Sequence, residues 1–201
     1  MARDDRLRLF CALRLPEETV DALVRWQQRE LRDDLDGSRR EAGEGDAARR
    51  EVAIRLVPPP NLHVTLAFLG PRPAGELPAI VAALRAAAGE AGAIRLRVRG
   101  YRETRSVGML TFDDEDRRAV ALAERLHGLL EQAGVYRREA RPWLPHLTVL
   151  RFRERPRLDP SLPDLGEVSP SDAAVYISRL RSTGAQYEVL ETAELGPRRG
   201  R

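Results

Sequence analysis

The chain carries the same short pattern twice, and this repetition narrows the folds open to it. The tetrapeptide His-Val-Thr-Leu occupies residues 63–66, and His-Leu-Thr-Val occupies residues 146–149, 83 residues further along. Leucine and proline precede each copy, and apolar residues alternate through it, which is typical of a β-strand. We therefore expect two similar halves in which these strands occupy equivalent positions about a pseudo-twofold axis.

Segments typical of strands outnumber those typical of helices. The strands mostly occur as neighbouring pairs, which favours antiparallel sheets over a doubly wound parallel sheet. The predicted fold class is α+β, with two pseudo-symmetric lobes around a central cleft that carries the two His-x-Thr-x motifs. We predict strands at 6–15, 52–57, 62–70 (ended by Gly70-Pro71), 94–103, 107–112 and 144–154, a hairpin over 173–195 that turns near Thr183-Gly184, and helices at 16–31, 77–92 and 114–134.

The length of 201 residues fits a single two-lobed domain over residues 1–201. Residues 32–50 have almost no apolar content and predict a mobile surface loop. Residues 155–170 hold four prolines and predict another loop, and residues 197–201 predict a disordered tail. A monomer is expected.

Composition excludes several classes of chemistry. All 34 basic residues are arginine, so a lysine Schiff base and a Walker-type phosphate lysine are excluded. The single cysteine, Cys11, excludes an internal disulfide and a cysteine-rich zinc site. No apolar run approaches the roughly 18 to 20 residues of a membrane span, and the N-terminus has no apolar secretory segment, so we expect a cytoplasmic protein without a membrane partner. The net charge of +3 permits an anionic ligand without requiring nucleic acid.

Two of the three histidines, His63 and His146, open the repeated motif. Because alternate residues of a strand point to one face, His63 shares a face with Thr65, and His146 shares a face with Thr148. If the two faces meet across a cleft, the site suits phosphodiester cleavage without a metal or other cofactor. One ring can accept a proton from the attacking oxygen while the other donates one to the leaving oxygen, and the threonine hydroxyls can bind phosphoryl oxygens.

Other side chains near the motifs admit a functional and a structural interpretation. Arg151 follows His146 by five residues, so strict alternation places it on the opposite face, unless twist or a bulge redirects it toward a phosphate. Zinc is the rival interpretation of the histidine pair, but no clear third ligand stands beside either motif. The remaining candidates are Trp143 and Phe10, for base stacking or the core; Asn61, for a turn; and His127, as a helical residue.

Two longer segments carry a resemblance to a known family. LVPPPNLHVTLAFLG and RPWLPHLTVLRF resemble the two signature segments of the two-histidine (2H) phosphoesterase superfamily. The branch they resemble is that of bacterial and archaeal RNA 2′,3′-cyclic phosphodiesterases, historically called 2′-5′ RNA ligases. The opening RLFCALRLP and the closing YISRLRSTGAQYEVL extend the resemblance over nearly the whole chain, with residues 32–50 as the clearest departure.

The resemblance implies an activity and a role for each motif residue. The activity is metal-independent opening of a 2′,3′-cyclic phosphate at an RNA end, such as a tRNA fragment, to give a 2′-phosphate. His63 would donate a proton to the leaving 3′ oxygen, and His146 would activate water. Thr65 and Thr148 would hold the phosphoryl oxygens, and Arg151 would contact the phosphate. Reverse 2′-5′ ligation, a hydrolase of small cyclic nucleotides or 2′-5′ linked oligonucleotides, and an RNA-end binding module without turnover stay open as alternatives.

Overall fold

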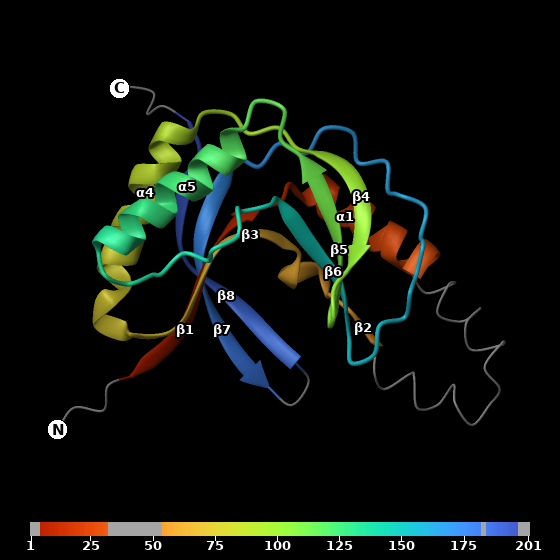
Figure 1. Cartoon of the computed structure of the whole chain (residues 1–201), viewed down its shortest axis with the longest axis horizontal. Helices are drawn as coiled ribbons and strands as arrows, with labels where there is room; N and C mark the ends of the chain where they lie inside the picture. The colour runs from red at the N-terminus through yellow and green to blue at the C-terminus, as the bar shows by residue number, and fades with distance from the viewer. Residues whose placement is uncertain (1–4, 32–53, 182–183, 197–201) are drawn as a thin grey trace.

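The computed structural model describes residues 5–31, 54–181 and 184–196. Over these residues the chain forms a curled antiparallel sheet of eight strands in the order β4-β5-β6-β3-β1-β7-β8, with β2 also paired to β6 (Figure 1). The predicted α+β class with antiparallel pairing is confirmed. The strands are β1 (Arg6–Arg14), β2 (Ile54–Leu56), β3 (His63–Pro73), β4 (Arg97–Glu103), β5 (Val107–Asp113), β6 (His146–Phe152), β7 (Asp172–Arg181) and β8 (Gly184–Glu194). The α-helices are α1 (Glu17–Trp26), α4 (Leu77–Ala91) and α5 (Arg118–Gln132). The short turns are the π-helical η1 (Gln27–Leu31) and the 3₁₀ turns η2 (Pro59–Asn61) and η3 (Ala74–Glu76).

The two halves of the sheet meet at a single residue pair. Val64 of β3 lies opposite Leu147 of β6, and the described strands form no other β3–β6 pair. One half holds β1, β3, β7 and β8 with α4 and α5 packed on it, and the other holds β2, β4, β5 and β6 with α1 beside it (Figure 1). The two predicted lobes are therefore halves of one continuous sheet.

The motif strands bury one face in the core between the sheet and the helices. Val64, Leu66, Leu147 and Val149 are at most 1% exposed. Burying a side chain of this size stabilises the fold by about 1.5–3 kcal/mol. The histidines and threonines of the motifs alternate with these residues, so they lie on the other face and stay half-buried.

The first motif strand is longer than predicted. β3 continues through Gly70 and Pro71 to Pro73, and it pairs with β1 as far as Arg6. Its only other neighbour in the described sheet, β6, contacts it at the opposite end. A proline is tolerated in this stretch because its missing N–H can face away from the ladder, so the predicted end at Gly70-Pro71 is wrong.

The third predicted helix starts later than its acidic residues suggest. α5 begins at Arg118, four residues after the predicted start at 114. Asp114 stays outside the helix, and its Oδ2 accepts a hydrogen bond from the Val120 N–H at 2.8 Å. The carboxylate therefore satisfies a free N–H group of the first turn from outside, as a capping residue does.

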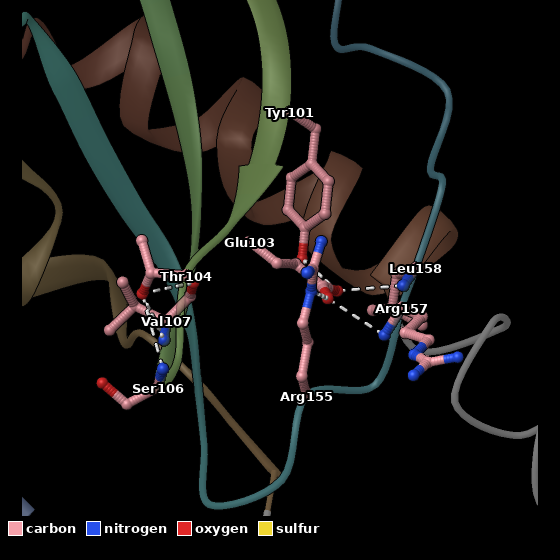
Figure 2. A network of polar contacts seen from close by, with 8 residues as sticks. All are labelled: Tyr101, Glu103, Thr104, Ser106, Val107, Arg155, Arg157 and Leu158. Carbon is pink, nitrogen blue, oxygen red and sulfur yellow. Dashed lines mark hydrogen bonds and ion pairs between the residues drawn. The ribbon is translucent and has the colours of Figure 1, made fainter.

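Glu103, the last residue of β4, holds the segment that follows β6 (Figure 2). Its side chain is 2% exposed. It accepts hydrogen bonds from Arg155 Nε, from the backbone N–H groups of Arg157 and Leu158, and from the Tyr101 hydroxyl, at 2.9–3.2 Å. One carboxylate therefore fixes the course of a chain segment that has no ladder of its own.

The remaining predictions concern loops and the hairpin. Residues 155–170 form a loop as predicted, with one isolated bridge between Leu96 and Val168. The predicted hairpin is confirmed, because β7 and β8 pair along their full lengths and β8 starts at Gly184. Thr183, residues 32–50 and residues 197–201 lie outside the described residues.

Candidate functional site

The register of β3 against β6 brings the two motifs together. Extending the single observed pair by one residue in each direction sets His63 opposite Thr148 and Thr65 opposite His146. All four side chains lie on the face away from the helices and are half-buried. This register places each motif histidine across from the threonine of the other motif, and His63 Nε2 contacts the hydroxyl of its own Thr65 at 3.1 Å.

A β-bulge in β6 turns Arg151 to the same face. Thr148 and Leu150 pair with consecutive residues of β5, so Val149 is an extra residue in the ladder. Val149 and Leu150 are both buried, whereas Arg151 is exposed. Strict alternation would put Arg151 on the core face, and the bulge that the sequence analysis named as the exception is present.

β3 has the same bulge at the equivalent position. Thr65 and Ala67 pair with consecutive residues of β1, so Leu66 is the extra residue. Burial then follows the same order along the two strands, with two buried residues before one exposed residue. In β3 that exposed residue is Phe68, which is 51% exposed.

The sequence analysis did not single out Phe68. The Arg8 guanidinium carbon lies 4.9 Å from the centre of its ring, a cation–π contact. A signal for it was present, because Phe68 follows His63 by the five residues that separate Arg151 from His146. The two motifs therefore present an aromatic ring and a guanidinium at equivalent positions.

These side chains line a cavity of about 460 Å³. Three arginines, Arg8, Arg55 and Arg151, lie in its wall, and no acidic residue of the described chain does. This charge favours an anionic ligand. Of the five predicted site residues, four line the cavity, namely His63, Thr65, Thr148 and Arg151.

His63 lies in an aromatic pocket. Its ring stacks on Phe10 with centroids 4.9 Å apart, and the rings of Tyr176 and Tyr187 lie 5.8 and 5.4 Å away. Its Nε2 is 3.1 Å from Thr65 Oγ1. The ring is therefore held on three sides while its Nε2 edge reaches the cavity wall.

Burial lowers the pKa of His63 to about 4. The backbone of Asn61 opposes this shift, and the positive charge of Arg151 adds to it. The ring of the ligand-free protein is therefore neutral at pH 7.

His146 is held by its other ring nitrogen. Its Nδ1 is 2.8 Å from the Leu144 carbonyl oxygen. A carbonyl only accepts hydrogen bonds, so Nδ1 carries the proton, and the neutral ring presents an unprotonated Nε2. His146 does not line the cavity, and the register of β3 against β6 places it across from Thr65.

The free energy of unfolding is expected to decrease as the pH falls from about 6.5 to about 4. The unfolded His63 binds a proton below its ordinary pKa of 6.5, whereas the folded ring resists protonation until about pH 4. This stabilisation is complete above pH 6.5 and is lost as the pH falls to 4, by at most about 3 kcal/mol. Urea unfolding at several pH values measures it. His63→Gln should lack this part of the pH dependence, and an unchanged dependence in that variant would contradict the assignment.

Of the other sequence candidates, Phe10 and Asn61 line the cavity and Trp143 does not. Trp143 is half-buried, and its Nε1 donates a hydrogen bond to the Thr65 carbonyl at 3.0 Å. Phe10 is buried beneath His63. Asn61 donates from Nδ2 to a backbone carbonyl of β8 at 2.8 Å, so it ties the turn before β3 to the hairpin.

Cys11 is buried and does not line the cavity. Burial raises the pKa of Cys11 to about 12, so its thiol stays protonated at neutral pH. Within residues 5–31, 54–181 and 184–196, no three His, Cys, Asp or Glu side chains gather as a set that could hold a metal ion. None of the described helices is both long and apolar enough to cross a membrane.

Comparison with known proteins agrees with this geometry. The model of the 2′-5′ RNA ligase superfamily matches residues 29–181, which is most of the chain. The chain belongs to the 2′-5′ RNA ligase superfamily. This result confirms the resemblance to the 2H phosphoesterases drawn from the two motifs.

Individual members of the superfamily are similar over nearly their whole length. An RNA 2′,3′-cyclic phosphodiesterase of Thermus thermophilus is 32% identical, and the match covers 97% of this chain and 93% of that protein. The crystal structure of TT0787, also of Thermus thermophilus, aligns with a TM-score of 0.72 at 32% identity, over 96% of this chain and 100% of that one. Escherichia coli LigT in its apo form aligns with a TM-score of 0.71 at 23% identity, over 96% and 99% of the two chains, which supports the fold alone.

Proposed function

We propose that this protein hydrolyses the 2′,3′-cyclic phosphate at an RNA end to a 2′-phosphate, without a metal, through acid–base catalysis by His63 and His146. The observation that carries the proposal is the meeting of two imidazole–hydroxyl pairs on one sheet face beside an arginine-lined cavity. The family and the name of the Thermus relative support the same activity. 2′-5′ ligation, in which a 5′ hydroxyl replaces water as the attacking group and the same bond between phosphorus and the 3′ oxygen breaks, is proposed as a secondary activity.

In the proposed reaction a water oxygen attacks phosphorus, and the bond between phosphorus and the 3′ oxygen breaks. Nε2 of His146 takes the proton of the water, and His63 donates a proton to the 3′ oxygen. Each transfer typically contributes about 10²- to 10⁴-fold to the rate. The Thr65 and Thr148 hydroxyls and the Arg151 guanidinium bind the phosphoryl oxygens, where negative charge is stabilised.

The proposed acid, His63, must be protonated when the substrate is bound. Burial is the main cause of its low pKa in the free protein, and the positive charge of Arg151 adds to it. A phosphate anion near Arg151 offsets this repulsion and favours the protonated ring. We therefore expect saturating inorganic phosphate to raise the pKa of His63, which an NMR titration of the imidazole protons measures. A pKa that stays at its ligand-free value would argue against His63 as the acid.

The aromatic part of the cavity supports an RNA end as the substrate. Phe68 exposes its ring beside Arg8, and base stacking on an exposed aromatic ring is worth about 1–3 kcal/mol. We expect Phe68→Ala to raise the KM for an RNA oligomer with a cyclic phosphate end about tenfold. Phe68→Tyr keeps the ring and should leave this KM close to wild type. Equal KM values in the two variants would show that no base stacks there.

Turnover of a 2′,3′-cyclic mononucleotide with excess chelator present tests the proposed function. We expect a 2′-phosphate product, which phosphorus NMR distinguishes from a 3′-phosphate. Binding without turnover would overturn the proposal in favour of an RNA-end binding module. The same assay with an oligomer that bears the same end then compares kcat/KM. A preference for the mononucleotide would favour a hydrolase of small cyclic nucleotides.

A further inference from the structure

The two bulges change the hydrogen bonding of the backbone in the motif strands. The extra residue of a bulge has no opposite residue in the ladder that the bulge interrupts, so its carbonyl is bonded from outside that ladder. These carbonyls belong to Leu66 and Val149, the fourth residues of the two motifs, and the Val149 carbonyl already accepts a hydrogen bond from the Val57 N–H on the β2 side at 3.0 Å. Both side chains are buried in the core, so water is a poor source of a further donor.

Each carbonyl receives a hydrogen bond from a buried side chain on the helical side of the sheet. Gln27 Nε2 lies 2.8 Å from the Val149 carbonyl, and His127 Nε2 lies 2.8 Å from the Leu66 carbonyl. Gln27 and His127 are among the few buried polar residues of the described chain. A carbonyl only accepts, so Nε2 of His127 carries the proton.

Along the chain, each donor follows a strand of one half but bonds a strand of the other half. α1 follows β1, yet Gln27, which follows α1, bonds a strand of the second half, β6. α5 follows β5, yet His127 of α5 bonds a strand of the first half, β3. The pseudo-symmetry of the strands therefore extends to the side-chain donors that bond them. The donor is the amide of Gln27 for β6 and the imidazole of His127 for β3.

Gln27 does more than cap one carbonyl. Its amide also donates to the Val57 carbonyl at 3.1 Å, and the Val57 N–H donates to the Val149 carbonyl at 3.0 Å. Gln27 is also the first residue of the π-helical turn η1. A π turn inserts a residue into a helix and re-aims its side chains, and such turns are frequent at functional sites.

We infer that Gln27 and His127 are positioning residues that hold the two bulges, and through them aim Arg151 and Phe68 into the cavity. Without the extra residue, the fifth position after each histidine would fall on the core face. The inference rests on the proposed function only for the choice of phosphate and nucleotide as ligands. A positioning role differs from a purely structural role in one testable way. Gln27 should act on ligand binding through Arg151, and His127 should act through Phe68.

Double-mutant cycles on ligand affinity test the inference. Gln27→Met keeps the volume and removes the donor. We expect it to weaken the binding of inorganic phosphate, measured by calorimetry, on the order of tenfold in the wild-type background and less than about twofold beside Arg151→Ala. His127→Leu should weaken the binding of 2′-AMP by a similar factor, and this loss should vanish beside Phe68→Ala but persist beside Arg151→Ala.

Two control variants separate positioning from loss of stability. Trp26→Phe removes the neighbouring buried donor, which bonds the Ser161 carbonyl at 2.7 Å and not a motif strand, and it should leave phosphate affinity unchanged. His127→Gln places an amide nitrogen near the position of the imidazole Nε2 and should restore much of the 2′-AMP affinity.

The outcomes are distinct. Additive losses in every background, or an equal loss in Trp26→Phe, would overturn the inference. Coupled losses in a protein that binds phosphate yet never opens a cyclic phosphate would support the inference and overturn the proposed function. A wild-type protein that binds neither ligand would overturn both.

Discussion

Replacing either motif histidine by alanine is expected to lower the turnover of a 2′,3′-cyclic phosphate at least about 10²-fold. His63→Ala removes the proposed proton donor, and His146→Ala removes the Nε2 that accepts the proton of water. Both rings are half-buried on the cavity side of the sheet and not in the main core, so the fold should survive. Steady-state kcat/KM measures the loss, and thermal unfolding followed by circular dichroism checks the fold.

The double variant sharpens this prediction. Groups that act as a unit lose most of their effect when one member is removed, so His63→Ala with His146→Ala should be little slower than the worse single variant. Losses that multiply instead would indicate that the rings serve independent steps. A folded single variant that keeps wild-type turnover would remove that residue from the mechanism.

Much of the fold could be predicted because the relevant signals are local. Alternation of apolar and polar residues predicted the motif strands, and acidic starts and glycine stops predicted the helices approximately. The prediction that the strand ends at Gly70-Pro71 was wrong. A proline is excluded from a strand only where a partner strand needs its N–H, and β6 does not reach that part of β3. Which neighbour flanks a strand at a given residue is a tertiary property that composition does not carry.

The site could be predicted in part for the same reason. Two His-x-Thr patterns on strands place imidazole and hydroxyl on one face without further information. The bulges left a weaker signal, since each motif runs into a second consecutive apolar residue, Ala67 after Leu66 and Leu150 after Val149. A strict period of two cannot accommodate such a pair, so the doubled apolar step marks an extra residue. Strict alternation alone places Arg151 on the wrong face, which is why a bulge had to be named as the exception, and Phe68 was missed.

The side chains that hydrogen-bond the bulge carbonyls could not be predicted at all. Gln27 and His127 lie far in sequence from the carbonyls they bond, Val149 and Leu66, and nothing in their own neighbourhoods links them to a motif. The low pKa of His63 has the same origin, since it depends on rings from β1, β7 and β8 that pack around it. The hydrogen bonds to the bulge carbonyls and the pKa of His63 both depend on non-local packing. The residue types of the motifs can be identified from the local sequence pattern.

The second large effect is expected on stability, from Glu103→Leu. The substitution keeps most of the volume but leaves the backbone N–H groups of Arg157 and Leu158 without the acceptor they share. An unsatisfied donor costs about 1–3 kcal/mol when it is buried, and these two donors are part-buried, so the free energy of unfolding should fall by about 2–3 kcal/mol. The Arg155 guanidinium adds little to this loss, because its side chain is 60% exposed and water can replace the carboxylate.

Glu103→Gln is the matched control. It removes the charge but keeps one side-chain oxygen that can accept from a backbone N–H, so it should lose roughly half as much stability as Glu103→Leu. Urea unfolding of the three proteins at pH 7 measures the series. If the Leu variant unfolds at the wild-type urea concentration, the carboxylate does not hold the loop. If the Gln variant loses as much as the Leu variant, the segment depends on the charge or on the second carboxylate oxygen, because both variants lack these two features.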